Sequence, residues 1–228
     1  MRRITSQSSL TDYQHFIEKV YGPSNRRHFT APEMLTNIER YVMRSLKGIR
    51  KNDTDKIQLN VVIALNWFLS LLNLLEIDLE KAVWNRFPYL CSYCGTCPCS
   101  CKEKKVKKRK SLRISSALRP KTLHGFQEMF GRIYPASNRT LEHAGIHLAE
   151  EMGELSEAVL KFRGGHTKQD FYSIESEGAD LFSCFMGVCN SIHVDLAKEL
   201  AHLFPRGCHV CNKIPCVCEY SLVINFKS

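Results

Sequence analysis

Five acidic residues recur at helical spacing in the C-terminal half of the chain. Glu150, Glu151 and Glu154 stand at steps of one and three, and Glu177 and Asp180 repeat the three-residue step. Residues three or four apart share one face of a helix, where like charges destabilise it. Mg²⁺ relieves such repulsion because it binds carboxylate oxygens together with waters and substrate phosphates. The spacing therefore favours a divalent metal site, and a solvated acidic helix face is the alternative.

An internal repeat provides a control for this interpretation. Tyr21–Arg26 returns as Tyr134–Arg139, 113 residues later, and Ile77–Ala82 returns as Val194–Glu199, 117 residues later. Such self-similarity predicts two units of one fold. The residues of the first unit that correspond to Glu151, Glu154, Glu177 and Asp180 are then Ile38, Tyr41, Asn60 and Ile63. Because three of these four counterparts are apolar or aromatic, the acids should face the interior, where a carboxylate requires a partner.

Eight of the eleven cysteines form two clusters with the same spacing, Cys-x2-Cys-x4-Cys-x-Cys. They are Cys91, Cys94, Cys99 and Cys101 in the first unit, and Cys208, Cys211, Cys216 and Cys218 in the second. Four thiolates bind zinc in a closed structural site, and close regular spacing without a secretory signal favours metal. We expect two structural zinc ions, with disulfides as the alternative. Cys97, whose counterpart is Ile214, would be a spare thiol.

The net charge of +9 comes from one segment. Residues 102–121, from Lys102 to Lys121, carry ten Lys or Arg and a single acid, so the remainder of the chain is neutral on balance. Such a segment is typical of a solvated linker or of a contact with nucleic acid or another polyanion. It divides the chain into a first unit of residues 1–101, the basic linker 102–121 and a second unit of residues 122–228.

Each unit is predicted to contain four helices followed by a cysteine loop, because apolar residues recur at helical rather than alternating spacing. The expected helices are Leu10–Tyr21, one following Thr30, Asp55–Leu75 and Leu79–Phe87 in the first unit, and Leu123–Tyr134, Leu141–Phe162, Phe171–Ile192 and Leu196–Phe204 in the second.

Local signals support these boundaries. Thr30 with Glu33 is a capping-box pattern, and Asp78 and Asp195 have the position of N-caps. Gly164-Gly165 should end the second helix of the C-terminal unit. Only Ser221–Phe226 has the composition of a strand.

The apolar helices set the fold class. Val61–Leu75 is apolar nearly all round, as is its counterpart Leu181–Val188, so both must be buried. Packing the two units against each other buries both and gives an all-α bundle with pseudo-twofold symmetry. Val61–Leu75 is shorter than the ~20 residues of a membrane span, and Met1–Leu10 lacks the apolar core of a signal peptide. We expect a soluble, cytoplasmic protein with no membrane contact.

The acidic motifs resemble those of the MazG-like all-α nucleotide pyrophosphohydrolases. Leu148–Ala158 is similar to the first motif of that family, and Glu177–Leu181, Asn190 and Ile192–Leu196 are similar to its second motif and the following loop. The resemblance covers Phe126–Pro205 well and the first unit only as a degenerate copy. It implies two tandem four-helix repeats that form a pseudo-dimer within one chain, since family members usually pair subunits. Further oligomerisation is left open.

By this resemblance, the protein hydrolyses a nucleoside triphosphate (NTP or dNTP) to the monophosphate and pyrophosphate with Mg²⁺ or Mn²⁺. The resemblance implies that the metal ions are held by Glu151, Glu154, Glu177 and Asp180. Glu150 is the candidate to orient or deprotonate the attacking water.

Three further residues are candidates for substrate binding. Lys161 and Arg163 end the acidic helix and suit phosphates, although the helix dipole alone also favours cations there. Asn190 suits a nucleotide contact, but it recurs as Asn73, which favours a structural role at least as strongly.

The cysteine loops are not required by the family resemblance, so other functions stay open. One is a binding module in which the zinc loops and the basic linker dock on nucleic acid or a protein. Another is a regulatory pseudoenzyme that binds metal without turnover.

Overall fold

The computed structural model describes residues 3–104, 106 and 108–226, and every regular element in that part of the chain is helical. The all-α fold class is therefore confirmed. The first unit contains α1 (Leu10–His28), α2 (Ala31–Arg50), α3 (Thr54–Leu74) and α4 (Leu79–Arg86). The second contains α5 (Leu123–Ile133), α6 (Leu141–Gly165), α7 (Lys168–Ser191), α8 (Leu196–Leu203) and α9 (Tyr220–Asn225), and the short 3₁₀ turns are Ser116–Leu118 and Ala136–Asn138.

The predicted helix caps are confirmed. The side chains of Asp78 and Asp195 accept hydrogen bonds from the backbone N–H groups of Lys81 and Lys198. Thr30 and Glu33 form the expected capping box at the start of α2. These caps satisfy N–H groups that have no partner within the helix.

One local prediction is wrong. Ser221–Phe226 is not a strand, because α9 spans Tyr220–Asn225. An isolated strand among helices would leave its backbone groups unpaired, whereas a helical turn pairs them within the segment.

The double glycine marks the end of α6, as predicted. Gly165 is the last residue of the helix, and His166 follows with φ 50° and donates its N–H to the Phe162 carbonyl.

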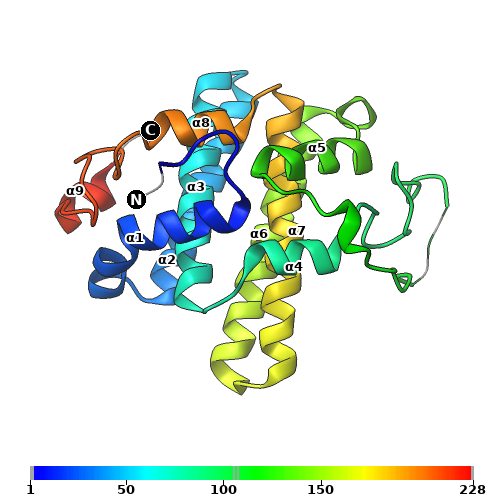
Figure 1. Ribbon diagram of the computed structural model, residues 1–228, viewed down its shortest axis with the longest axis horizontal. Helices are drawn as coiled ribbons and strands as arrows, with labels where there is room; N and C mark the ends of the chain where they lie inside the picture. Colours follow the sequence, from blue (N-terminus) through cyan, green and yellow to red (C-terminus); the bar gives the residue numbers. More distant parts are fainter. Residues whose placement is uncertain (1–2, 105, 107, 227–228) are drawn as a thin grey trace.

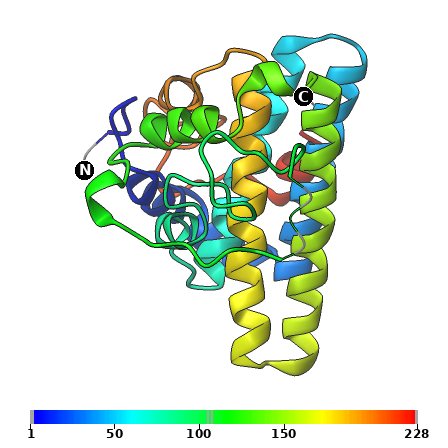
Figure 2. The same ribbon diagram turned by 90° about the vertical axis from the view of Figure 1, so that its right-hand side faces the viewer.

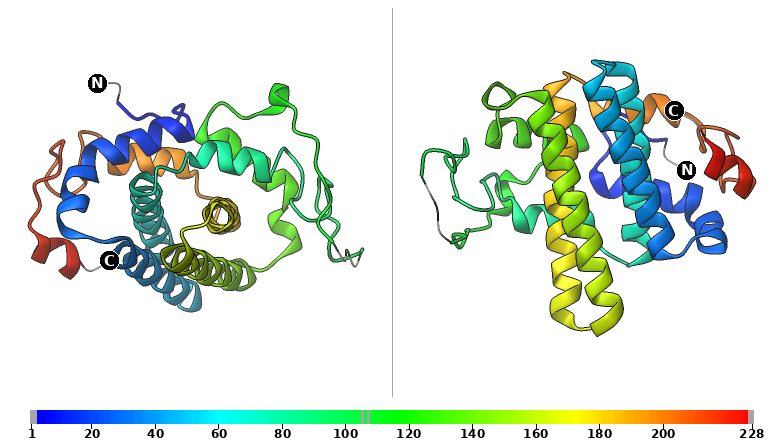
Figure 3. Two further views of the ribbon diagram at one scale, coloured as in Figure 1. Left: turned by 90° about the horizontal axis from the view of Figure 1, so that it is seen from below. Right: turned by 180° about the vertical axis from the view of Figure 1, so that it is seen from behind.

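The four long helices form the centre of the fold. α2 pairs with α3 and α6 with α7, and α2 packs against α6 (Figure 3). Phe68 on α3 contacts Phe185 on α7, with their ring centroids 6.1 Å apart. By length and composition α3 is long and apolar enough to cross a membrane, but 72% of its most apolar window is buried inside this fold.

The short helices of each unit pack on the other unit. α4 lies against α7, and Phe87 contacts Phe130 of α5 at a centroid distance of 5.1 Å (Figure 1). In the reciprocal contact, the Tyr13 hydroxyl on α1 donates a 2.8 Å hydrogen bond to the carbonyl of Ala197 on α8. Side chains of α4 can therefore reach a site built on α7.

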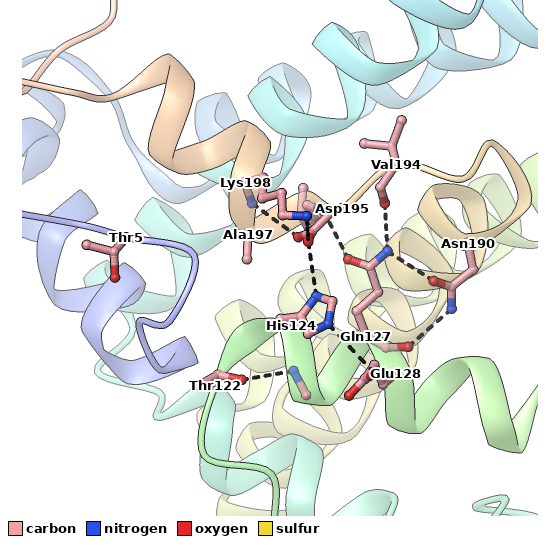
Figure 4. A network of polar contacts seen from close by, with 12 residues as sticks. Thr5, Thr122, His124, Gln127, Glu128, Asn190, Val194, Asp195, Ala197 and Lys198 are labelled. Carbon is pink, nitrogen blue, oxygen red and sulfur yellow. Dashed lines mark hydrogen bonds and ion pairs between the residues drawn. The ribbon is translucent and has the colours of Figure 1, made fainter.

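A glutamine connects the helices within each unit. The Gln127 amide donates to Asn190 Oδ1 (3.0 Å) and to the Val194 carbonyl (2.7 Å), as Figure 4 shows. It also accepts a hydrogen bond from the Leu196 N–H (2.9 Å). Asn190 in turn donates to the Gln127 carbonyl at 3.2 Å.

The first unit repeats this network. Gln14 donates to the Ile77 carbonyl, accepts from the Leu79 N–H, and receives a hydrogen bond from Asn73 on its own carbonyl. Gln14 and Gln127 are the 113-residue counterparts, and Asn73 and Asn190 the 117-residue counterparts. The sequence repeat is thus also a repeat of polar contacts.

The burial pattern corrects the alignment of α2 with α6. Their N-caps, Thr30 and Thr140, stand 110 residues apart, and buried residues of α2 match buried residues of α6 at that spacing. Examples are Ile38 with Leu148 and Val42 with Met152. The counterpart of Glu151 is therefore Tyr41 and not Ile38, and the counterpart of Glu154 is Arg44 and not Tyr41. The error arose because positions one helical turn apart carry similar residues, so a single sequence does not distinguish the two alignments.

We predict that Gln127→Leu destabilises the protein by about 2–4 kcal/mol. The substitution leaves the Val194 carbonyl and the Leu196 N–H without partners, and each buried unpaired group costs about 1–3 kcal/mol. Urea denaturation measures the loss. Gln169→Leu, on an exposed position of α7, is the matched control and should change the free energy of unfolding little; equal effects of both variants would contradict the role of the network.

Candidate functional site

Three carboxylates converge between α6 and α7. Oxygen atoms of Glu151, Glu177 and Asp180 all lie within 4.8 Å of one another. Asp180 is buried, and Glu151 and Glu177 are partly buried. Among the described residues, Glu151 Oε2 and Glu177 Oε2 are buried and have no hydrogen-bond partner. Two unpartnered carboxylate oxygens directed into an acidic cluster have the donor chemistry that a hard divalent cation requires.

Two arginines from outside α6 and α7 hold Asp180. Arg86 on α4 donates to both of its oxygens, with Nε 3.0 Å from Oδ1. Arg109 of the basic segment donates to Oδ2 at 3.5 Å. Burial alone would lower the pKa of Arg86, but the hydrogen bonds and charge of Asp180 outweigh it and raise the pKa. Oδ2 accepts from both arginines, whereas Oδ1 accepts only from Arg86 and keeps a second lone pair, through which Asp180 can bind a cation while the arginines fix its orientation.

The sequence analysis did not identify Arg86 as a site residue. It belongs to the first unit, and only the packing of α4 on α7 brings it to the acids of the second. A signal was nevertheless present, because the counterpart of Arg86 on α8 is the apolar Leu203.

Two acids of the cluster, Glu151 and Glu177, resist ionisation. Burial, followed by the charges of Asp180, Glu154 and Glu177, raises the pKa of Glu151 to about 8. Burial and the charge of Asp180 also raise the pKa of Glu177. A bound cation reverses this balance because it favours the ionised carboxylates.

The other predicted acids lie at the edge of this cluster or outside it. Glu154 is exposed and does not join the three converging oxygens, although its charge acts on Glu151 and Glu177. In the corrected alignment the counterpart of Glu154 is Arg44, a charged and only partly buried residue, which agrees with an exposed position for Glu154. Glu150 is exposed and lies 3.9 Å from His147 of its own helix.

The three predicted substrate contacts are placed elsewhere. Lys161 is exposed and pairs with Glu157 at 2.5 Å. Arg163 is exposed in the last turn of α6, near the tip of the projecting α6–α7 hairpin (Figure 2). Asn190 forms two hydrogen bonds with Gln127, as expected if this asparagine has a structural role and does not contact a nucleotide.

Other cations surround the acids instead. Arg86, Arg109 and Lys110 line a cavity of about 190 Å³ together with Tyr172 and Glu175. On the same side of α7, the guanidinium of Arg139 crosses over Gly187, where a Cβ would stand 2.2 Å from its Nη2. Arg139 Nε is buried without a partner among the described residues, and burial lowers the pKa of this arginine. Carboxylates flanked by arginine and lysine side chains could bind a metal ion together with an anion such as phosphate.

The two cysteine clusters have the geometry of tetrahedral metal sites. The four sulfur atoms of each cluster lie within 4.8 Å of one another. Cys91 and Cys101 are 3.8 Å apart and Cys94 and Cys99 3.9 Å, and the second cluster repeats both distances. A tetrahedron of sulfurs with ~2.3 Å bonds to zinc has edges of about 3.8 Å. All eleven cysteines are free thiols, so the disulfide alternative is not supported.

Each cysteine loop is docked on the first helix of the opposite unit. The Cys99 N–H donates to the Ile133 carbonyl at 2.8 Å, and the Cys216 N–H donates to the Val20 carbonyl at 2.7 Å. The two contacts correspond to each other in the repeat, because Val20 and Ile133 are 113-residue counterparts and Cys99 and Cys216 are 117-residue counterparts. The Tyr134 hydroxyl also reaches Cys91 Sγ at 3.4 Å, so the loops fasten the two units together.

The basic segment is partly used by the fold. Arg109 reaches Asp180, and Arg119 pairs with Glu80 at 2.9 Å. Lys104, Lys108 and Lys110 are exposed. Lys105 and Lys107 lie outside the described residues.

Comparison with known proteins gives no family for this chain. No family model matches it, and no curated protein or solved structure has a significant match. Its function must therefore be inferred from the two kinds of site described above.

We predict that the purified protein contains two zinc ions per chain. Cys216→Ser removes a ligand of the second cluster and should reduce the zinc content to about one, with a lower melting temperature, because structural zinc contributes directly to folding. Metal analysis by mass spectrometry measures the stoichiometry. Cys97→Ser is the control, since Cys97 belongs to neither cluster, and it should keep both ions. A zinc-free protein that retains its fold would contradict the assignment.

We also predict that Glu151 makes the metal-free protein less stable as the pH rises. Its pKa is about 8 in the folded protein, so between pH 5 and 8 the folded state holds a proton that the unfolded chain has released, and stability falls with rising pH. Glu151→Gln stays neutral and should raise the melting temperature of metal-free protein at pH 8 by about 2–4 °C, the effect of about 1 kcal/mol.

Added Mg²⁺ provides the second half of this test. It should raise the melting temperature of the wild type at pH 8 more than at pH 5.5, because protons compete for the same oxygens. The rise should be absent in Glu151→Gln. An equal Mg²⁺ effect in both proteins would exclude Glu151 as a ligand.

Proposed function

We propose that this protein is a Mg²⁺- or Mn²⁺-dependent nucleoside triphosphate pyrophosphohydrolase of the MazG-like kind. The observation that carries the proposal is the convergence of Glu151, Glu177 and Asp180 with two buried, unpartnered oxygens. These three residues are on the two motifs that resemble the family. Burial and neighbouring charges favour the protonated forms of Glu151 and Glu177 in the metal-free protein, and a bound cation would supply the partner that a buried carboxylate requires.

Glu151, Glu177 and Asp180 would hold the metal, with Glu154 at the edge of the cluster. A bound magnesium ion supplies Lewis-acid polarisation of phosphate oxygens and a more acidic bound water. The products would be a nucleoside monophosphate and pyrophosphate: the water oxygen bonds to the α phosphorus, the P–O bond to the α–β bridging oxygen breaks, and pyrophosphate leaves with that oxygen.

The chain's own cations would bind and orient the triphosphate. Arg86 keeps Asp180 in one orientation through two hydrogen bonds. Arg109 and Lys110 line the adjoining cavity and offer positive charge to phosphates. Arg139 offers a buried Nε that has no partner among the described residues. In this proposal these residues take the role first expected of Lys161 and Arg163, and Tyr172 on the cavity wall offers a ring to the base or sugar.

The first unit would act as the partner that family members recruit as a second subunit. Supporting this, α4 of the first unit provides Arg86, and the polar network and loop contacts recur at matched positions. The pseudo-dimer within one chain would therefore hold one complete acidic site. A soluble, cytoplasmic location stays a prediction of the sequence.

The test is pyrophosphate release from a panel of ribo- and deoxyribonucleoside triphosphates. With Mg²⁺ the wild type should turn over at least one triphosphate, and Glu151→Gln should lower kcat by at least about 100-fold, since removal of a ligand impairs both metal binding and charge stabilisation. Glu154→Gln should lose less activity, because Glu154 lies only at the edge of the cluster.

Glu157→Gln is the matched control on the same helix. Glu157 is exposed and paired with Lys161, so its loss should change kcat less than about twofold. If no triphosphate is hydrolysed while Mg²⁺ still stabilises the protein, the pseudoenzyme alternative is favoured.

Binding of a polyanion is the second candidate function. It is favoured by the exposure of Lys104, Lys108 and Arg113, which have no acidic neighbour among the described ion pairs. Replacement of Lys104, Lys108 and Arg113 by Gln should then abolish retention on a heparin column, without effect on pyrophosphate release, because Arg109 and Lys110 beside the acidic cluster stay in place.

A further inference from the structure

The first unit contains its own cavity at the position that the acidic cluster occupies in the second. The cavity measures about 70 Å³ and is lined by Tyr41 of α2 and by Ile63 and Trp67 of α3. In the corrected alignment Tyr41 corresponds to Glu151, and Ile63 corresponds to Asp180. The same scaffold position therefore presents rings and aliphatic side chains where the other unit presents carboxylates.

The lining of this cavity carries no Asp, Glu, Lys or Arg side chain. One wall is formed by Cys208, Cys216 and Cys218 of the second cysteine cluster, and aromatic rings of Tyr21, Tyr41, Trp67 and Phe226 form most of the rest. These cysteines are already committed to the proposed zinc ion, and burial lowers the pKa of the neighbouring His209. An anionic ligand such as phosphate would therefore find no cationic partner there, which favours an uncharged ligand. Rings favour a planar partner that can stack or meet them edge to face.

One polar atom in this apolar surface lacks a partner. Asn66 lines the cavity, its side chain is only 7% exposed, and its Oδ1 atom is buried without a hydrogen bond in the described part of the chain. A buried acceptor without a partner costs about 1–3 kcal/mol. A ligand that donates one hydrogen bond to Asn66 would remove that cost.

The C-terminal segment covers the cavity and is held by a small set of contacts. Arg40 donates to the carbonyls of Ile224 (2.8 Å) and Phe226 (2.9 Å). The ring of Tyr220 meets Phe29 at a centroid distance of 5.4 Å, and that of Phe226 meets His209 at 5.5 Å. Leu222 and Ile224, by contrast, are 48% and 36% exposed. Outward movement of this lid therefore breaks a few hydrogen bonds and these ring contacts. Because a cavity known to hold benzene measures ~150 Å³, a ring would enter here only as the lid moves.

We propose that this cavity is a second ligand site, which binds an uncharged single-ring heteroaromatic compound through a hydrogen bond to Asn66 Oδ1. The chemistry is that of a pyrimidine base, either free or as the base of a nucleoside. The site does not depend on the proposed hydrolase activity, because its residues and its lid are distinct from the acidic cluster.

The test is calorimetric titration of the zinc-loaded full chain, without added Mg²⁺, with uracil, uridine and uridine monophosphate. Uracil should bind, and its affinity should fall about tenfold in Asn66→Leu, the loss of about 1.4 kcal/mol. This variant is expected to fold at least as well as the wild type, because it removes an unpaired buried acceptor. A melting curve checks that point.

A second variant should have the opposite effect. Arg40→Ala weakens the hold on the lid and should tighten uracil binding about two- to fivefold, since the open form becomes more populated. Uracil should also accelerate chymotrypsin cleavage at Tyr220 or Phe226 in the wild type, as the lid is displaced.

The outcomes are decisive for this site alone. Equal uracil affinity of the wild type and Asn66→Leu, or no binding by either the wild type or Arg40→Ala, would overturn the proposal. Uridine binding as tightly as uracil identifies a nucleoside as the occupant, and uracil alone identifies the free base. Glu151→Gln should bind uracil like the wild type, so a failure of the triphosphate proposal is recognised separately.

Discussion

The repulsion among three carboxylates on facing helices is the constraint on which the second unit depends. Oxygen atoms of Glu151, Glu177 and Asp180 lie within 4.8 Å of one another, and burial together with the neighbouring carboxylates raises the pKa values of Glu151 and Glu177. Arg86 and Arg109 pair with Asp180 from outside the α6–α7 hairpin, and their positive charges partly offset the shift of Glu177. Glu151 and Glu177 nevertheless keep raised pKa values and one unpartnered buried oxygen each. The metal-binding proposal follows from this incomplete compensation.

The two units show how one scaffold supports opposite chemistry. Where the second unit has Glu151 and Glu154, the first has Tyr41 and Arg44. The segment after each cysteine loop returns over the corresponding site. In the second unit's site, Arg109 pairs with Asp180. Phe226, which lies 117 residues after Arg109, is its counterpart and lines the same cavity as Ile63, the counterpart of Asp180. Glu151, Asp180 and Arg109 of the second unit thus correspond to Tyr41, Ile63 and Phe226, whereas Glu154 corresponds to the charged Arg44. Apolar or aromatic residues therefore replace the charges at the centre of the site, and a charged residue is found only at its edge.

The fold was largely predictable from the sequence because local signals and the repeat agreed. Periodicity located all eight principal helices, and the Asp78 and Asp195 caps marked two of their starts. The predictions that failed depended on distant contacts. Residues 221–226 resembled a strand, but no partner strand exists for them within the described helical fold. The alignment of α2 with α6 was shifted by three residues, nearly one helical turn, which a single sequence does not resolve. Only burial distinguished Tyr41 from Ile38 as the counterpart of Glu151.

The sequence predicted only the part of the acidic site that lies on α6 and α7. Glu151, Glu177 and Asp180 follow from spacing, whereas Arg86 comes from a helix that crosses between units, and Arg109 from a segment that composition alone describes as a linker. This crossing gives the first unit a role in the acidic site. Without α4, Asp180 would lose both hydrogen bonds from Arg86, and α7 would lose part of the surface that buries it. The first unit therefore contributes to the acidic site through packing and charge, although it has no acids at the corresponding positions.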